Sequence, residues 1–366
     1  MWWMVSDLHL RTGGDRRGTG AAFVELLDAI ADTAPEADRH LVLLGDTFDL
    51  PGDDGAAARL EALAVRHPGV LAALRRTLAT GTHLEVVCGN HDAALARPAV
   101  QAALRRLLTP APRSWPAPHP GTVRVHPWML HVRGVFHAEH GHQHHDLHRV
   151  PTLLSQPSSP GPIESPLSAW TRAAGAGRLD RLDGVRRAVR DVRRAERTAR
   201  GPAYLALVDA EAVRTGLPVD AGRALARTSR FRTIPVALDA GRRVGARRLG
   251  VERPGTRLRR AAARVHGVLD EHGAAVPSLV FGHAHRADHH VIAGTSACYL
   301  NTGTWSDDVR GPGPDQIDNQ LFPYVRVDAT GEDGAVTTQA ALHYWSSRGR
   351  GPRVSSTSRK EPVRRG

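Results

Sequence analysis

The sequence predicts an α/β fold in which helices cover a sheet. Two apolar runs, residues 40–46 (HLVLLGD) and residues 83–88 (HLEVVC), have the composition of strands buried on both faces, and each leads into polar residues. An amphipathic helix before the first run is indicated by the i, i+3, i+4, i+7 spacing of Phe23, Leu26, Leu27 and Ile30. This alternation of strand, loop and helix is typical of α/β domains, and the pattern alone favours a doubly wound parallel sheet.

Further elements follow from the same patterns. A helical stretch spans residues 60–78 with a break at Pro68-Gly69, and another helix is predicted at residues 93–108. A closing hairpin turns through residues 330–334. The remaining strand-like segments are residues 2–7, 122–126, 128–137, 278–281, 297–300, 322–327 and 336–344.

The polar motifs divide the chain into a catalytic domain and an insertion. Residues 1–146 and 266–345 carry the motifs and are predicted to form the two parts of the catalytic domain. Residues 147–265 are interpreted as an arginine-rich, mostly helical insertion that acts as a lid or cap. Residues 346–366 are Ser, Arg, Gly and Pro with little to bury, so this tail is predicted to be disordered.

The positive charge of the chain is concentrated in the insertion. The formal net charge is +12, and the stretch Arg178–Arg260 holds 22 Arg against 9 Asp and Glu, a net of +13. Three interpretations remain open: a solvated helical face, a lid whose arginines bind substrate phosphates, or a surface for nucleic acid or an anionic membrane. Aromatic residues are sparse there, which disfavours stacking on single-stranded nucleic acid.

Composition also narrows the location of the protein. No run of eighteen apolar residues is present, so no membrane-spanning segment is predicted. The first polar motif begins at Asp7, which leaves no room for a signal peptide, and we expect a cytoplasmic protein. Cys88 and Cys298 lie in apolar strand-like runs and are expected to be buried, reduced thiols.

Five short polar segments follow predicted strands and supply carboxylates, imidazoles and one carboxamide. They are Asp7-Leu8-His9, Gly45-Asp46-Thr47-Phe48-Asp49, Gly89-Asn90-His91-Asp92, His140-Gly141-His142 and Gly282-His283-Ala284-His285. Mixed nitrogen and oxygen ligands suit Mn, Fe, Zn or Co rather than Ca or Mg. Each motif alone could be turn chemistry. Their joint occurrence at successive strand ends is what predicts a metal site.

In this order the motifs resemble those of the calcineurin-like metallophosphoesterases, over residues 1–145 and 278–306. The resemblance implies a β-sandwich of mixed sheets flanked by helices, in place of one parallel sheet, with two metal ions at the strand ends. Within that superfamily the chain is similar to the UDP-2,3-diacylglucosamine pyrophosphohydrolases, although its insertion is longer and more basic. The similarity lies in GDTFDL at 45–50, EHGH at 139–142 and NTGTW at 301–305.

The resemblance also implies the roles of the ligands. Asp7, His9 and His285 would hold the first ion, and Asp46 would bridge to the second. The second ion would also be held by Asn90, His140 and His283. Six histidines lie between His137 and His148, so His142 remains an alternative to His140.

Two further residues are expected to take part in catalysis. By the same resemblance, His91 would protonate the leaving oxygen and Asp49 would orient the His91 ring, while Asp92 would be a structural turn or cap residue. The implied activity is hydrolysis of a phosphodiester or pyrophosphate bond by water that two divalent cations activate, with Mn²⁺ as the expected metal. The expected substrate is a small phosphoester or a nucleotide-diphosphate-linked molecule.

Three other functions are compatible with parts of the sequence. A metal-dependent nuclease of the same superfamily is the first alternative. A protein serine/threonine phosphatase is disfavoured. The motifs of that group read Gly-Asp-x-x-Asp-Arg-Gly and Gly-Asn-His-Glu, whereas this chain has Leu50-Pro51 in place of Arg-Gly and Asp92 in place of Glu. A scaffold without activity is disfavoured, because every ligand type is present.

Overall fold

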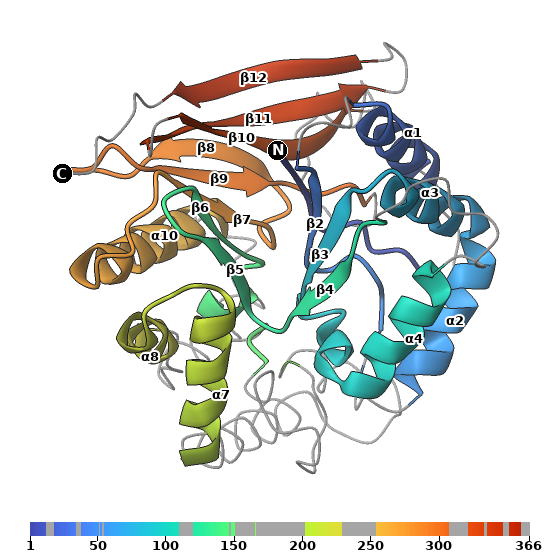
Figure 1. Cartoon of the computed structure of the whole chain (residues 1–366), viewed down its shortest axis with the longest axis horizontal. Helices are drawn as coiled ribbons and strands as arrows, with labels where there is room; N and C mark the ends of the chain where they lie inside the picture. Colours follow the sequence, from blue (N-terminus) through green and yellow to red (C-terminus); the bar gives the residue numbers. More distant parts are fainter. Residues whose placement is uncertain are drawn as a thin grey trace, which may run out of the picture.

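The protein has two mixed β-sheets in the part of the chain that a computed structural model describes (Figure 1). The α/β class is therefore confirmed, and the doubly wound parallel sheet that the pattern alone favours is wrong. The described residues are 1–11, 18–33, 38–50, 52, 55–109, 120–145, 148–150, 165, 202–228, 254–306, 321–332, 335–346 and 351–359.

The first sheet has seven strands in the order β12-β11-β10-β1-β2-β3-β4. Its parallel half is formed by β1 (Trp2–Val5), β2 (His40–Leu44), β3 (His83–Val87) and β4 (Val123–His126). Its antiparallel half is formed by β10 (Leu321–Glu332), β11 (Ala335–Ser346) and β12 (Gly351–Arg359). The predicted closing hairpin is thus confirmed as β10 and β11. Strand β1 joins the halves, because Trp3 pairs with Leu41 on one side and with Arg326 on the other.

The second sheet has five strands in the order β5-β6-β7-β9-β8. Strands β6 (Phe136–Glu139), β7 (Ser278–Phe281) and β9 (Cys298–Thr302) are parallel. The edge strands β5 (Met129–Val132) and β8 (Ala287–Val291) are antiparallel to their neighbours. The single strand predicted at residues 128–137 is wrong, because the chain turns through Gly134, whose φ is +75°, and forms a hairpin.

Apolar side chains pack in three clusters that separate four layers. Between the two sheets lie Met4, Val42, Phe136, Val280 and Leu300. The other face of the seven-stranded sheet packs on the helices α1 (Thr19–Ala31), α2 (Ala56–Arg66), α3 (Pro68–Ala79) and α4 (Pro98–Leu108). The other face of the five-stranded sheet packs on α7 (Pro202–Arg214), α8 (Val219–Thr228) and α10 (Pro254–Glu271).

The continuous apolar composition of β2 follows from this layering. Leu41 and Leu43 face the helices, whereas Val42 and Leu44 face the second sheet. Successive side chains of a strand point to opposite faces, so a strand covered on both faces needs apolar residues at every position. The apolar residues of the run HLVLLGD predicted at 40–46 are therefore explained by two cores rather than by one.

Proline accounts for two helix boundaries. Pro68 and Pro98 each stand in the first turn of a helix, where the missing N–H has no partner to lose. Arg97 is extended, with φ −81° and ψ 133°, because a following proline disfavours the helical conformation. The single helix predicted at residues 93–108 is therefore wrong. A short 3₁₀ turn at Ala93–Ala96 precedes α4.

The predicted insertion does not end where expected, because α10 continues across residue 265 to Glu271. The described helices α7, α8 and α10 form the outer layer over the five-stranded sheet, in one core with Met129, Leu279 and Tyr299. The rest of the predicted insertion, except residues 148–150 and 165, lies outside the described residues. This includes most of its arginines.

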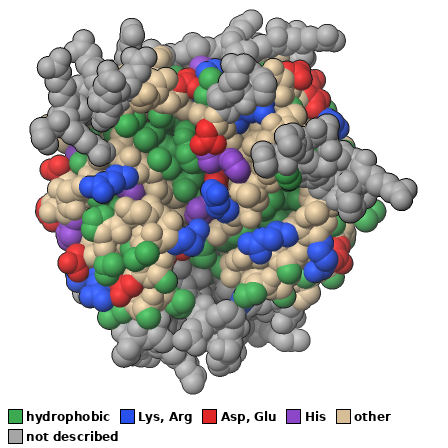
Figure 2. All heavy atoms as spheres, viewed as in Figure 1, with side chains coloured by type: hydrophobic (Ala, Val, Ile, Leu, Met, Phe, Trp, Pro, Cys, Tyr) green, Lys and Arg blue, Asp and Glu red, His purple; other side chains and the backbone are tan. Residues whose placement is uncertain are grey.

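Arginines of the described helices pair with nearby acids. Arg214 lies 2.5 Å from Glu211, Arg223 lies 2.6 Å from Asp209, and Arg259 lies 2.6 Å from Asp288. On the face shown in Figure 2, Arg side chains are scattered among acidic, apolar and polar ones. The solvated-face interpretation therefore holds for these three arginines, and the other two interpretations stay predictions for the remainder.

Composition predicts a disordered tail at residues 346–366, but part of this tail forms a strand. Residues Gly351–Arg359 form β12, which pairs with β11 at the edge of the first sheet. Edge pairing uses backbone hydrogen bonds, which polar and small residues form as well as apolar ones do. Composition measures what a segment can bury, so it does not reveal such a strand.

The structure bears on the two cysteines and on the expected absence of a membrane-spanning helix. Cys88 and Cys298 are buried free thiols, as predicted, and burial raises the pKa of Cys88 well above its ordinary value. Among the helices of the described residues, none combines the length and the apolar character that crossing a membrane requires.

Candidate metal centre

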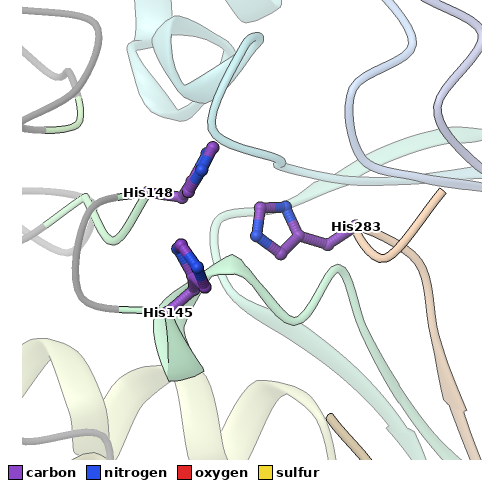
Figure 3. Close-up of side chains that lie close together, drawn as sticks. All are labelled: His145, His148 and His283. Atoms are coloured by element: carbon purple, nitrogen blue, oxygen red, sulfur yellow. The ribbon is translucent and has the colours of Figure 1, made fainter. Parts of the chain in front are cut away.

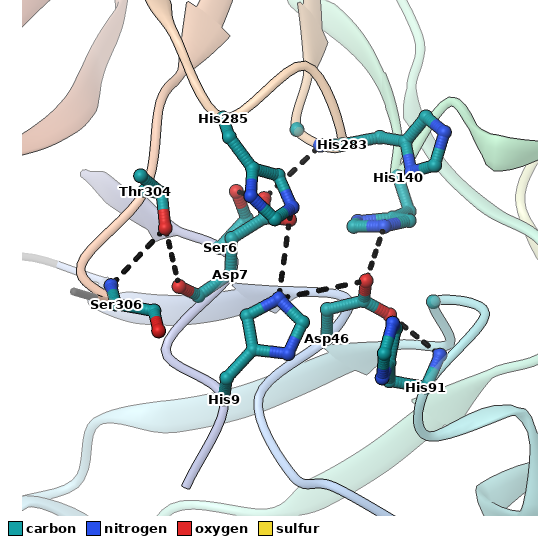
Figure 4. Close-up of polar contacts among 12 residues, drawn as sticks. Ser6, Asp7, His9, Asp46, His91, His140, His283, His285, Thr304 and Ser306 are labelled. Atoms are coloured by element: carbon teal, nitrogen blue, oxygen red, sulfur yellow. Dashed lines mark hydrogen bonds and ion pairs between the residues drawn. The ribbon is translucent and has the colours of Figure 1, made fainter. Parts of the chain in front are cut away.

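The predicted ligands lie on loops that leave the carboxyl ends of parallel strands. Asp7 and His9 follow β1, and Asp46 follows β2 in the same sheet. His140 follows β6, and the His283–His285 loop follows β7 in the other sheet. Figure 4 shows these side chains converging from both sheets on the carboxylate of Asp46. The centre therefore sits where the two sheets meet at one end.

The ligand atoms form two clusters that share Asp46. In the first, atoms of Asp7, His9, Asp46 and His285 all lie within 4.8 Å of one another. His285 Nε2 is 2.9 Å from Asp7 Oδ1, and His9 Nε2 is 3.9 Å from both Asp7 Oδ1 and Asp46 Oδ2. In the second, atoms of Asp46, His140 and His283 lie within 4.8 Å, with His140 Nε2 at 3.2 Å from Asp46 Oδ2.

The backbone of these loops is strained at the ligands. Five residues other than glycine have a positive φ in the described part of the chain: Asp7 (55°), His9 (49°), Asp46 (51°), His283 (63°) and His285 (55°). All five are predicted ligands. A left-handed backbone costs a non-glycine residue on the order of 1–2 kcal/mol, and such residues gather at functional sites.

Hydrogen bonds between the loops hold this conformation. The N–H of Asp7 donates to Gly45 O at 3.0 Å, and that of His9 donates to Asp46 O at 2.9 Å. The N–H of His283 donates to Asp7 Oδ2 at 3.0 Å. The first loop is thus fastened both to the next loop of its own sheet and to the loop of the opposite sheet.

Three glycines in the motifs are required by close packing of these loops. A Cβ on Gly89 would lie 2.2 Å from Asp46 Oδ1, and one on Gly45 would lie 2.5 Å from His140 Cγ. A Cβ on Gly282 would lie 2.5 Å from Ser6 Oγ and 2.9 Å from Asp7 Oδ2. The glycines directly before Asp46, Asn90 and His283 are therefore the sequence signal of loops that touch.

The two buried carboxylates stay ionised. Burial raises the pKa of Asp46, but the imidazoles of His140 and His91 outweigh it and hold the pKa well below the ordinary value. Burial likewise raises the pKa of Asp7, and His285 and His140 more than offset it. The N–H of His91 also donates to Asp46 Oδ1 at 2.8 Å, which leaves Oδ2 facing the imidazoles.

Several ligand atoms lack the partner that a buried polar atom requires. Among the described residues, His9 Nε2, Asn90 Oδ1 and His283 Nδ1 are buried and have no hydrogen-bond partner. Leaving such an atom unpaired costs about 1–3 kcal/mol. Burial holds the pKa of His283 well below its ordinary value, so this ring is neutral, the form that binds a cation. The donor set fits a pair of divalent cations of the Mn, Fe, Zn or Co type.

The structure separates His140 from its alternative His142. His140 Nδ1 lies 2.9 Å from Leu44 O and donates to it, which fixes the ring and leaves Nε2 towards Asp46. His142 is also buried, but its ring centroid is 5.4 Å from that of His140 and it joins neither of the two clusters around Asp46. Burial lowers the pKa of His142 to about 3. The geometry therefore favours His140 as the ligand.

Asp49 contacts two imidazoles rather than one. Its Oδ1 is 3.1 Å from His91 Nδ1, as expected of a residue that orients His91. The same oxygen is 3.1 Å from His9 Nδ1, a contact the sequence did not indicate. Burial lowers the pKa of His91, but Asp46 and Asp49 more than offset it and raise the pKa to about 9. The side chain of His91 is 43% exposed, so it borders the open side of the centre.

Asp92 ties two of the loops together, in agreement with its predicted structural role. Its Oδ1 accepts a hydrogen bond from the N–H of Gly89 at 2.7 Å, and its Oδ2 accepts one from the N–H of Thr47 at 2.8 Å. Burial, with a smaller contribution from Asp46, raises its pKa to about 6. The carboxylate therefore braces the loop after β2 against the loop after β3.

The segment NTGTW at 301–305 hydrogen-bonds to the loops that carry the predicted ligands. Thr304 Oγ1 donates to Asp7 O at 3.0 Å, and Asn301 Nδ2 donates to Gly282 O at 2.6 Å. Ser6 Oγ also hydrogen-bonds to Asp7 Oδ2 and, at 2.6 Å, contacts Thr302 Oγ1. The sequence similarity at this segment indicated no role for it. It positions the loops that carry Asp7 and His283.

No protein-family model and no curated protein matches the chain. The resemblance to metallophosphoesterases thus remains an inference from the motifs.

Proposed function

We propose that this protein is a metal-dependent phosphoesterase that hydrolyses a phosphodiester or pyrophosphate bond. One observation carries the proposal: all five left-handed, non-glycine residues of the described chain are candidate ligands that meet around Asp46. A fold retains such strain where a function requires the geometry. Two ligand clusters that share one carboxylate suit a pair of ions acting on one phosphate.

The chain supplies the following groups to that chemistry. Asp7, His9 and His285 would hold one cation, and His140 and His283, with the unpartnered Oδ1 of Asn90, would hold the other. Asp46 would serve both, because its Oδ2 lies 3.9 Å from His9 Nε2 and 3.2 Å from His140 Nε2. When bound, divalent cations activate water and stabilise the charge that develops on the phosphate oxygens.

His91 and Asp49 supply the proton for the leaving group. His91 Nδ1 lies 3.1 Å from Asp49 Oδ1 and donates to it, so one proton stays on Nδ1, and the charged ring carries its second, transferable proton on Nε2. The half-exposed ring of His91 can approach a substrate, unlike the buried ring of His140. His91 then hands a proton to the departing oxygen.

Metal removal tests the proposal. Dialysis of the full chain against a chelator is expected to abolish hydrolysis of bis(p-nitrophenyl) phosphate, and added Mn²⁺ is expected to restore it. The same assay on the Asp46→Asn variant, purified in parallel, controls for contaminating enzymes. Full activity in the chelated protein would contradict the proposal.

Replacing His91 by alanine is expected to separate metal binding from catalysis. Metal content should be unchanged, since His91 belongs to neither cluster that shares Asp46. The rate should fall by about 10²–10⁴-fold on esters with alkoxide leaving groups, which need a proton, and by much less on p-nitrophenyl esters. The check is kcat for both substrate types together with the metal content. An equal loss on both types would argue against proton donation.

The substrate class follows from a panel assayed with Mn²⁺. Nucleotide-sugar pyrophosphates, cyclic nucleotides, phosphomonoesters and single-stranded DNA cover the alternatives. We propose a small phosphoester or a nucleotide-diphosphate-linked molecule. Efficient cleavage of DNA alone, with binding that weakens steeply as salt rises, would identify a nuclease instead.

A further inference from the structure

A third group of histidines lies beside the metal centre. His145 and His148 face His283, and their candidate ligand nitrogens all lie within 4.8 Å of one another (Figure 3). The ring centroids are 4.4 Å apart for His145 and His148, 4.8 Å for His148 and His283, and 5.6 Å for His145 and His283. His145 and His148 take no part in the two clusters around Asp46.

Local structure places the first two rings on the same side of the chain. The N–H groups of His148 and Arg149 both donate to His145 O, at 3.0 and 2.9 Å, which holds His148 beside His145. His145 follows the 3₁₀ helix His142–His144, which comes after β6.

Sheet topology brings the third ring to them. Strand β6 pairs in parallel with β7, so the chain segments that leave their carboxyl ends lie side by side. His283 is the second residue after β7, and its backbone is held by Asp7 Oδ2. The site is therefore built on two adjacent strand ends, as the centre around Asp46 is.

The donor set differs from that of the neighbouring centre. Three imidazoles without a carboxylate suit Zn²⁺, Co²⁺, Ni²⁺ or Cu²⁺, whereas Mn²⁺ prefers oxygen-rich sites. Tetrahedral nitrogens about 2.1 Å from an ion are about 3.4 Å apart. Nitrogens within 4.8 Å can reach that spacing when each pair of rings closes by up to about 1.4 Å.

His283 can serve two sites as an imidazolate: the ring N–H proton passes to solvent, and each of the two nitrogens, on different edges of the ring, then has a lone pair for one ion. Its Nδ1 is buried without a hydrogen-bond partner among the described residues. Figure 3 shows a ring edge of His283 turned towards the space between His145 and His148. One imidazole thus links this group to Asp46 and His140.

We propose that His145, His148 and His283 form a separate site for one transition-metal ion of the zinc type. The site goes beyond the proposed phosphoesterase activity, because binding there requires no hydrolysis. The three-histidine site and the centre around Asp46 are expected to differ in metal preference. Mn²⁺ should fill only the centre around Asp46, and Zn²⁺ should fill both the centre and the three-histidine site.

Metal counting on the full chain tests the site. The protein is stripped with chelator, equilibrated with Mn²⁺ or Zn²⁺, desalted and analysed by mass spectrometry of its metals. The wild type is expected to retain about two manganese ions or about three zinc ions per chain. The His145→Ala/His148→Ala variant should lose one zinc and no manganese. His272→Ala/His290→Ala, which removes two histidines placed elsewhere, should retain all three zinc ions. Equal zinc content in the wild type and the His145→Ala/His148→Ala variant would overturn the site.

Two further measurements separate this inference from the phosphoesterase proposal. In the Asp46→Asn background one zinc ion should remain, and adding His145→Ala/His148→Ala should remove it. The visible spectrum of the Co²⁺ form should lose a tetrahedral band with the His145→Ala/His148→Ala change, while far-UV circular dichroism stays that of a folded chain. One zinc in both the wild type and Asp46→Asn would support the three-histidine site and contradict the paired centre. No zinc in Asp46→Asn would overturn the three-histidine site.

Discussion

Replacing Asp46 by asparagine is expected to lower kcat/KM for a phosphodiester on the order of 10³-fold or more and to remove the paired metal ions. Asp46 belongs both to the cluster with Asp7 and His285 and to the cluster with His140 and His283. Its Oδ2 faces His9 and His140. Asparagine removes the charge but keeps the shape, and its side-chain oxygen can still accept from the N–H of His91. Metal analysis and steady-state kinetics on the same preparation provide the measurement.

A carboxylate away from the centre provides the control. Asp288 on β8 pairs with Arg259 and lies outside both clusters, so Asp288→Asn should keep its metal and its rate. An Asp46→Asn protein that still binds both ions and turns over at the wild-type rate would remove the basis for a shared ligand.

Replacing Gly89 by alanine is expected to destabilise the protein by about 1–3 kcal/mol and to weaken metal binding. The added Cβ would lie 2.2 Å from Asp46 Oδ1 and 2.4 Å from the backbone nitrogen of Asp46. A side chain could rotate away, but a backbone atom moves only if the loop moves. The loop after β2 would then have to leave the position that holds Asp46. The midpoint of unfolding in urea and the metal content of the folded protein measure both effects.

Gly69 offers a matched substitution away from the metal centre. It lies in α3, and a Cβ there would have no atom within 4 Å. Gly69→Ala should therefore stabilise the protein by about 0.5–1 kcal/mol, as alanine does in a helix. If Gly89→Ala unfolds at the same urea concentration as the wild type, the two loops are not packed as closely as the distances indicate.

Sequence patterns predict individual strands and helices well, but they do not predict which strands pair with each other. The apolar run of β2 and the spacing of Phe23, Leu26 and Leu27 identify a strand and a helix, because burial on given faces imposes those periods. The pattern of β1 is the same whether its neighbour is parallel β2 or antiparallel β10, since either pairing buries the same side chains. Partner choice depends on the rest of the chain, so pattern alone favoured one parallel sheet.

The site shows the same division. Motif order suggested which residues would meet, yet it could not decide among the histidines between His137 and His148, which differ little in local sequence. The fold decides: His140 lies against Asp46, whereas His144 Nε2 lies 2.9 Å from Glu139. The contact between His9 and Asp49, and the approach of His145 to His283, likewise depend on how two loops lie in space.

The fastening of Asp7 to His283 joins positions 276 residues apart in the chain. During synthesis the N-terminal loops with Asp7, His9 and Asp46 leave the ribosome long before β7 exists, and β10, the antiparallel neighbour of β1, comes later still. Contacts of such long range form slowly, because the intervening chain must first be brought together. The emerging N-terminal half therefore carries only part of the ligand set, and the centre closes only near the end of translation.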